Sequence, residues 1–191
     1  MKPMAKTLCR LGAIVLVTFA IACTEDEPRI TPAAIDELAR SRELVYPGAR
    51  LLERQTELLR EAHFILNPYS KVAPLMAIYD TEASLDQVVA FYVARYDSGE
   101  PTPNESNQMR ALPPPAFYSR GDLATDAQGV KPILDQLHVS ADISRAIGSY
   151  RGATFLGKPG LPRVTLQRPY FDVLRSETVD RTLIVMVNDE R

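Results

Sequence analysis

The amino-acid sequence predicts an α+β domain: a small, mostly antiparallel sheet with a C-terminal β-hairpin, packed by one main helix at about residues 84–97 and by shorter helices. Two observations lead to this class. Apolar residues in SLDQVVAFYVARY recur at the spacing of one helical face. The end of the chain contains three strand-like runs, RVTLQ, YFDVLR and RTLIVMVN, separated by turn-like RPY and SETVD. Within the last run, LIVMV is apolar on both faces, as expected of a central strand.

The main helix begins with a capping signal. Ser84 is a suitable N-cap, and Gln87, three residues later, completes a capping box. Gly99 lies just beyond the expected end. The apolar residues on one face of this helix are Leu85, Val88, Val89, Tyr92 and Tyr96. We interpret this face as part of the core rather than as an aromatic binding stripe.

The region before this helix combines a turn, a helix and a strand. Pro47 and Gly48 suit the centre of a type II turn, because Pro fixes φ and Gly supplies a positive φ. Paired apolar residues then repeat every seven positions, which predicts a helix over 56–66, with Glu53, Glu57 and Glu61 on a solvated face. The apolar run 75–79 predicts a buried strand.

Three segments of this region, VYPGA, PLMAIYDT and SLDQVVAFYVARY, follow one another in the order seen in an uncharacterised module of bacterial envelope proteins. The chain resembles that module over residues 45–97: a Tyr-Pro-Gly-Ala turn, a strand ending in a Tyr-x-Thr-like element, and a helix with Val-Val-x-Phe-Tyr. The resemblance implies an architecture and no activity. It also implies a strand directly after the turn, so residues 50–55 are left open between strand and helix.

The second half of the chain is expected to be more irregular before the terminal strands. Residues 98–116 form a proline-rich segment that predicts a long exposed loop. Short helices are predicted over 132–139 and 142–147, the second ended by Gly148. The tripeptide RGD at 120–122 is interpreted as a turn. SYRGATFL at 149–156 echoes VYPGARLL at 45–52, but one short echo does not establish a duplication.

The N-terminus has the layout of a secretory signal. Lys2, Lys6 and Arg10 precede twelve uncharged residues, 11–22, and acids follow from Glu25 onward. A spanning helix needs about 20 apolar residues, so this run is too short to cross a bilayer. A basic start with a short apolar core is typical of a signal peptide instead.

The stretch AIAC, ending in Ala22 and Cys23, resembles the lipobox of bacterial lipoprotein signal peptides, although Ala20 stands where that family prefers Leu. The resemblance implies cleavage between Ala22 and Cys23 and acylation of Cys23, which would anchor the mature chain in the membrane. Thr24, rather than Asp, follows the cysteine, which favours the outer over the inner membrane by the enterobacterial sorting rule. An ordinary cleaved signal or an uncleaved anchor are the alternatives. The only other cysteine, Cys9, lies in the predicted signal, so Cys23 has no disulfide partner in the mature chain.

These features predict a signal peptide at 1–22, a lipidated tether at 23–31 and a single periplasm-facing α+β domain at 32–191. The full chain has 22 Lys and Arg and 24 Asp and Glu. Removing the three signal cations leaves 19 basic residues and a net charge of −5, which argues against nucleic acid as a ligand. An acidic surface also disfavours broad electrostatic contact with anionic lipid.

The sequence contains no motif that names a reaction or a cofactor. His63 and His138 are the only histidines, and neither lies in a metal-binding spacing. No G-x-S-x-G, S-x-x-K or P-loop occurs. Four aspartates, Asp122, Asp126, Asp135 and Asp142, are spread along loops and short helices, which favours solvation over a paired acid and base. We therefore assign no catalytic, cofactor-binding or metal-binding residue.

Two classes of function follow. The first is a non-enzymatic envelope lipoprotein, an interaction or scaffolding domain with another envelope protein as a candidate partner. The second is a hydrolase or transferase whose site is assembled from scattered Asp, Ser and His. A pocket that joins His138 to two carboxylates, or to a Ser and a carboxylate, would favour the enzyme. An exposed apolar groove beside the proline-rich loop would favour binding.

Overall fold

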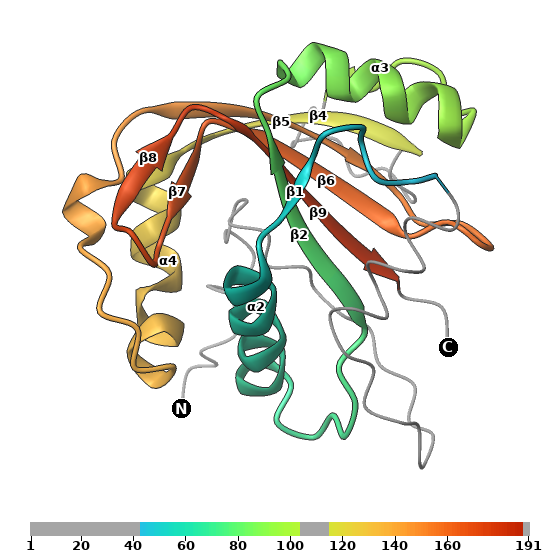
Figure 1. Cartoon of the computed structure of the whole chain (residues 1–191). Helices are drawn as coiled ribbons and strands as arrows, with labels where there is room; N and C mark the ends of the chain where they lie inside the picture. The colour runs from blue at the N-terminus through green and yellow to red at the C-terminus, as the bar shows by residue number, and fades with distance from the viewer. Residues whose placement is uncertain (1–42, 104–114, 189–191) are drawn as a thin grey trace, which may run out of the picture.

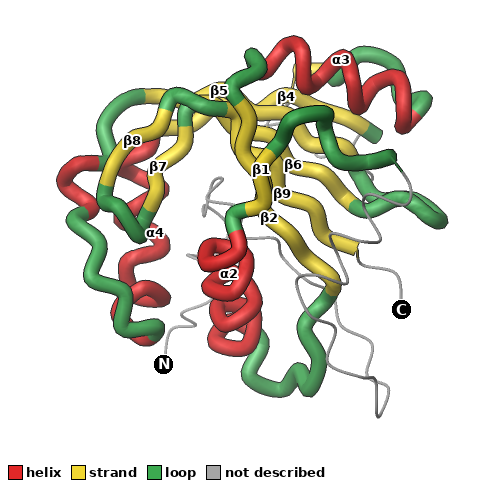
Figure 2. Tube along the Cα trace, in the orientation of Figure 1, coloured by secondary structure: helices red, strands yellow, loops and turns green. Residues whose placement is uncertain are grey.

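The computed structural model of the chain describes residues 43–103 and 115–188. Predictions for the signal peptide, the tether, Cys23 and the centre of the proline-rich loop fall on residues 1–42, 104–114 and 189–191, outside the described residues. The α+β class is confirmed: a mostly antiparallel seven-stranded sheet and a two-stranded hairpin pack with helices (Figures 1 and 2).

The sheet has the order β1-β2-β9-β6-β5-β4-β3, and the hairpin is formed by β7 and β8. All pairs are antiparallel except β3–β4. The strands are β1 (Arg50–Leu51), β2 (Leu75–Thr81), β3 (Thr102–Pro103), β4 (Ala116–Asp122), β5 (Ser149–Phe155), β6 (Arg163–Arg168), β7 (Tyr170–Asp172), β8 (Glu177–Val179) and β9 (Thr182–Asn188). As predicted, β9 is central, between β2 and β6.

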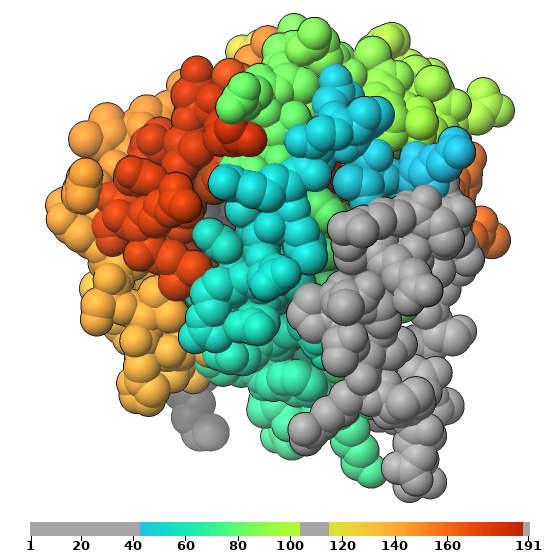
Figure 3. Space-filling view, in the orientation of Figure 1, coloured from blue at the N-terminus to red at the C-terminus, as the bar shows by residue number. Residues whose placement is uncertain are grey.

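Helices lie on both faces of this curved sheet. Helix α3 (Leu85–Tyr96) covers one face, and α2 (Glu53–Leu66) and α4 (Leu123–Gln136) lie beneath the other (Figure 1). A short 3-10 helix, η1 (Ile143–Arg145), follows α4. The hairpin β7–β8 lies beside α2 and α4, as the space-filling view shows (Figure 3).

Helix α3 forms as its sequence predicts. The Ser84 hydroxyl accepts the Gln87 N–H, and the Gln87 side chain accepts the Ser84 N–H at 2.9 Å, which completes the capping box. All five residues of the predicted apolar face are buried. The expected C-terminal glycine is displaced, because Asp97 takes the left-handed conformation at the C-cap and Gly99 follows it with positive φ.

The start of the described domain shows which elements residues 50–55 form. The Pro47–Gly48 turn is confirmed: Gly48 has φ +77° and the Ala49 N–H donates to the Tyr46 carbonyl at 3.0 Å. A short strand, Arg50–Leu51, follows this turn, and α2 begins at Glu53. Residues 50–55, which the sequence left open, therefore contain a two-residue strand followed by the start of α2.

Several predictions for the second half were wrong in extent. Helix α4 begins at Leu123, not at residue 132, and contains Pro132 in its interior. Asp122 caps it by accepting the Thr125 N–H at 2.9 Å. The helix predicted over 142–147 is a single 3-10 turn, η1, with Asp142 at its N-cap and Gly148 three residues after its end, at positive φ.

Two segments predicted as turns contain strand. The RGD tripeptide forms the end of β4 rather than a turn, and SETVD contributes β8 of the hairpin. The predicted loop 98–116 is bounded by strand at both ends, at Thr102–Pro103 and from Ala116. The two echoing segments have different structures, because 45–52 is mainly a turn and 149–155 is β5.

Side chains alternate across the sheet, and the buried apolar residues of its two faces form separate clusters. On the α3 face, Tyr92 and Tyr96 pack on Phe155 with ring centroids 5.8 and 5.5 Å apart. Leu166 and Ile184 complete that core. The opposite face carries a smaller cluster of buried residues that points toward α2 and the hairpin: Leu52, Met76, Ile78, Tyr170, Val185 and Val187.

Candidate functional site: an apolar cavity between α2 and α4

A cavity of about 160 Å³ lies between α2, α4, the hairpin and the sheet. Most of its wall is aliphatic. The lining residues are Gln55, Leu58, Leu59, Ala62, Ile78, Leu123, Val130, Ile133, Leu134, Leu137, Gln167, Tyr170, Phe171, Asp172, Val173, Leu183 and Val185. A concave, mostly apolar site with a few polar groups is the usual form of a small-ligand site in proteins.

The helix walls follow from sequence periodicity. Leu58, Leu59 and Ala62 lie on one face of α2, because residues three and four apart are neighbours on a helix. Residues 130, 133, 134 and 137 give α4 and its C-cap the same pattern on the facing side. The leucine pair that predicted helix α2 therefore supplies part of a cavity wall as well as core contacts.

The exposure of the lining residues locates the mouth. Leu58 and Leu134 are buried, whereas Leu59 and Ala62 on α2 are partly exposed. On the facing side, 133 and 137 are also partly exposed. The cavity therefore opens between the flanks of the two helices, and its rim is apolar.

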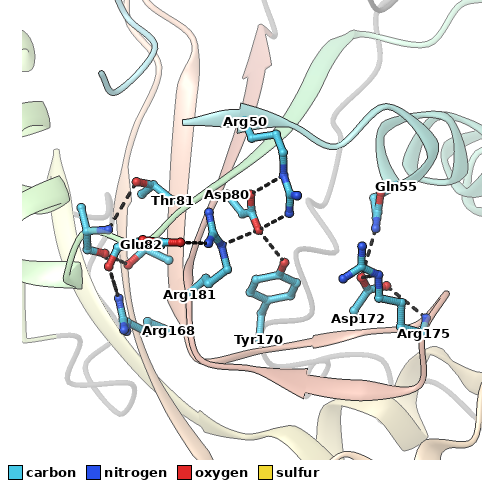
Figure 4. Close-up of polar contacts among 12 residues, drawn as sticks. Arg50, Gln55, Asp80, Thr81, Glu82, Arg168, Tyr170, Asp172, Arg175 and Arg181 are labelled. Carbon is cyan, nitrogen blue, oxygen red and sulfur yellow. Dashed lines mark hydrogen bonds and ion pairs between the residues drawn. The ribbon is translucent and has the colours of Figure 1, made fainter. Parts of the chain in front are cut away.

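One charged side chain lines the cavity. Asp172, at the end of β7, is 4% exposed and accepts hydrogen bonds from Gln55 Nε2 at 3.2 Å and from the Leu174 and Arg175 N–H groups at 2.9 and 3.4 Å (Figure 4). Arg175 Nε lies 3.8 Å from Asp172 Oδ2, the oxygen that also accepts from Gln55. The carboxylate is thus fixed in place and hydrogen-bonded, with its charge beside the apolar wall.

A second polar cluster holds the hairpin against the sheet. Asp80, in β2, is fully buried and accepts Arg50 Nε at 3.2 Å, Arg181 Nε at 2.8 Å and the Tyr170 hydroxyl at 3.2 Å (Figure 4). Burial, and then the Asp80 charge, raise the pKa of Tyr170 above its usual range. The hydroxyl therefore stays protonated and acts as a donor, and Tyr170 also lines the cavity.

This Asp80 cluster is structural in character. Its carboxylate is satisfied by the guanidinium groups of Arg50, in β1, and of Arg181, next to the start of β9. The hydroxyl of Tyr170, in β7, is its third partner. Removing one partner of a buried ion pair typically costs about 3–5 kcal/mol, because the remaining charge is left without compensation. The cluster fixes the position of Tyr170, and through it one wall of the cavity.

A third buried group is Asp126, in α4, with Tyr150, in β5. Within the described part of the chain, neither Asp126 Oδ2 nor the Tyr150 hydroxyl makes a hydrogen bond of normal geometry. Burial raises the pKa of Asp126, an effect that the nearby Tyr150 hydroxyl partly offsets.

The Tyr150 ring lies over Gly121, its partner in β4, where a Cβ atom would overlap the ring. Only glycine fits there, which explains the glycine in RGD.

The residues that the sequence singled out do not meet at one site. His63 is buried in α2, while His138 is exposed just beyond α4 with positive φ. Asp122 and Asp142 cap helices, and Asp135 pairs with Lys131 at 2.8 Å. Asp126 is buried, which corrects the prediction that all four aspartates are solvated. Neither histidine lines the cavity.

Sequence reasoning missed Asp80 and Asp172. A signal for Asp80 existed: it is a charged residue that ends the apolar run LMAIYDT, and buried charges require partners. Asp172 gave no local signal. The cavity lies at the end of β4 that leads into α4. The binding hypothesis placed an apolar groove beside the proline-rich loop, and most of that loop falls outside the described residues.

Within residues 43–103 and 115–188, no group of three or more His, Cys, Asp and Glu is arranged to hold a metal ion. In the same residues, no helix combines the length and apolarity needed to cross a membrane. Comparisons of the chain with protein-family models, curated proteins and solved structures gave no match.

Proposed function

We propose that the chain is a lipid-anchored, non-enzymatic binding protein of the bacterial cell envelope whose domain holds an apolar group in the cavity between α2 and α4. The aliphatic cavity carries this proposal. Apolar surface that remains accessible in a folded domain is favourably removed from water by an apolar ligand, at about 25 cal/mol per Å².

The chemistry of the wall supports binding over catalysis. Among the described residues that line the cavity, none is Ser, Cys or His. Asp172 has no second carboxylate beside it in the wall, and the Tyr170 hydroxyl already donates to Asp80. General acid–base or nucleophilic catalysis needs a group that can exchange a proton near the bound ligand. The alternative, a hydrolase or transferase, would need a histidine beside a carboxylate or a serine, and neither His63 nor His138 lines the cavity.

The anchor belongs to the same proposal. Acylation of Cys23 after cleavage behind Ala22 would hold the domain at the periplasmic side of the envelope, with the outer membrane favoured. Two or more acyl chains anchor a protein stably where one does not. The intact mass of the membrane-extracted protein tests this: we expect a mature chain that begins at Cys23 and carries lipid. A chain that begins at Met1, or at Cys23 without lipid, would contradict it.

Binding is tested with the full chain held in solution by a fluorinated surfactant, whose chains mix poorly with hydrocarbon. The probe is 1-N-phenylnaphthylamine, which fluoresces in apolar sites; its six-carbon phenyl ring fits the cavity, and its naphthyl group is expected to lie at the apolar mouth between α2 and α4. We expect saturable binding at one site per chain. Ala62→Phe places a ring in the cavity from the partly exposed rim of α2 and should weaken binding at least tenfold.

The matched control is Ala94→Phe, the same substitution at an exposed position of α3 on the opposite face of the sheet. Its binding should equal that of the parent. Equal binding by all three proteins would show that the probe does not occupy the cavity and would refute this part of the proposal.

A further inference from the structure

The size of the cavity limits what can enter it. An engineered protein cavity of about 150 Å³ binds benzene, whereas typical drug-sized sites have about 300–1,000 Å³. At about 160 Å³, the cavity accepts a group of about six carbon atoms and excludes a whole lipid or a helix. A longer ligand must therefore leave most of its length outside the mouth.

The wall also limits the chemistry of the group that enters. Leu, Ile and Val side chains dominate it, and the two aromatic residues, Tyr170 and Phe171, come from the hairpin alone. The hydrogen-bonding groups in the wall are largely used, because Gln55 donates to Asp172 and Tyr170 donates to Asp80. The inner part of the ligand should therefore be hydrocarbon with no polar atom.

The charge in the wall sets the direction of entry. Asp172 is buried beside the cavity with its partners already in place, so a second carboxylate placed inside would lose its hydration and meet no cationic side chain among the lining residues. An anionic amphiphile can therefore enter only with its methyl end first. Its head group stays at the mouth, where Leu59 and Ala62 are partly exposed to solvent.

The segment between Cys23 and the described domain indicates which molecule could supply such a group. Twenty residues separate Cys23 from Leu44, the first buried residue of the described domain, and they span at most about 75 Å. If Cys23 is acylated as proposed above, Leu44 stays within that distance of the bilayer, and the cavity on the other face of the sheet lies at most about one domain width further from it. Acyl chains are the most abundant apolar groups there. A side chain of a partner protein has no comparable support.

We propose that the cavity binds the methyl-terminal segment, about six carbons, of one unbranched acyl chain of an envelope lipid. This inference rests on the proposed function and specifies its ligand. The walls formed by α2 and α4 would contact the methyl-terminal carbons of the acyl chain. The rest of the acyl chain would leave through the mouth between the two helices.

Displacement of 1-N-phenylnaphthylamine from the full chain by saturated fatty acids of four to sixteen carbons tests the depth. Each methylene buried in the cavity should tighten binding about fourfold, which corresponds to about 0.8 kcal/mol. We expect this increase to level off once the inner six or so carbons are in place, at about eight to ten carbons in total. A series that rises at the same rate to sixteen carbons would overturn the inference.

Decanedioic acid, with a carboxylate at each end, tests the direction. It should displace the probe at least tenfold less well than decanoic acid, and its monomethyl ester should recover most of the loss. Equal displacement by the diacid and the monoacid would overturn the inference. Ile133→Gln, on the α4 side of the mouth, provides a second variant beside Ala62→Phe and should weaken decanoic acid without lowering the melting temperature by more than a few degrees.

The two proposals fail in different ways. If the probe binds in an Ala62-dependent manner but no fatty acid displaces it, the acyl-chain inference falls and the binding function stands. If neither the probe nor a fatty acid binds, both fall.

Discussion

The two faces of the central sheet are made from alternate residues of the same strands, yet they are packed differently. The α3 face is closed by aromatic rings and aliphatic side chains, with Tyr92, Phe155 and Leu166 fully buried. The α2–α4 face surrounds a cavity of about 160 Å³. Protein interiors normally leave few voids larger than a water molecule.

The difference has an energetic meaning. Apolar side chains that line an open cavity lack the contacts that a filled core would give them, so this face gains less stability from packing than the α3 face does. Domains have net stabilities of only about 5–15 kcal/mol. One face thus maximises stability, and the other gives up stability for space, as expected of a ligand site. Four experiments test this contrast.

The largest effect is expected from charges placed on the two faces of β9. Ile184 and Val185 are adjacent, and each is at most 1% exposed, but they point to opposite faces. Ile184→Asp buries an unpaired carboxylate in the closed core and should cost more than about 4 kcal/mol. Val185→Asp borders the cavity, where water can hydrate the charge, and should cost several kcal/mol but measurably less. Urea unfolding gives both values.

Equal losses for the two aspartate variants would mean that the faces are equally closed. A Val185→Asp protein that melts within a degree or two of the parent would instead show that residue 185 is not in a central strand.

Truncation of one leucine on each face should show the same contrast, with smaller losses of stability than the aspartate variants. Leu166→Ala opens a new void beneath α3 and should cost about 3–5 kcal/mol, near the upper end for such changes. Leu58→Ala enlarges a space that already exists and should cost about 2–3 kcal/mol. The free energies of unfolding of these two variants decide the matter, and a larger loss for Leu58→Ala would reverse the comparison.

The cap of α3 should contribute less. Ser84→Ala removes the acceptor of the Gln87 N–H and should cost about 1 kcal/mol, with no change in probe binding because α3 lies on the other face. Thermal unfolding and the probe assay are measured together. A loss of binding would show that the two faces are coupled.

The smallest effect on stability should come from substitution of Asp126. It should stabilise the folded protein, whereas the other substitutions destabilise it. Burial raises the pKa of Asp126 in the folded state, so the folded protein holds this proton more tightly than the unfolded chain does. The resulting stabilisation is present at low pH and is lost as the pH rises through the folded pKa, above the ordinary value of about 4.

Asp126→Asn removes this titration, so it should stabilise the protein at pH 7 relative to the parent, and the gain should shrink toward pH 3. Denaturant unfolding at several pH values measures this. A gain that is independent of pH would exclude titration of Asp126 as its cause.

Local features of the fold could be predicted because their physical causes are local. The capping box of Ser84 and Gln87 and the turn at Pro47–Gly48 depend on residues within four positions of one another. The heptad spacing of leucines gave α2, and an apolar run gave β9 its central place. Lipidation of Cys23 is also a local prediction, and it stays a prediction.

Helix α4 shows where local reasoning fails. Pro132 normally starts or breaks a helix, since it lacks an N–H and its ring crowds the preceding turn. Here it occupies an exposed position inside α4, while Leu123, Ala127 and Val130 bury the opposite side. The packing of that side against η1 and Tyr150 outweighs the local penalty, and no local pattern contains that information.

The sequence alone determined the class of the fold, the start of α3 and the central strand. Only the tertiary structure decided that a cavity exists, because its walls come from segments between residues 55 and 185 that have no spacing in common. It likewise joined Asp80 to Arg181, 101 residues away. Periodicity specifies which face of an element is apolar, whereas the space left between two such faces depends on how the whole chain packs.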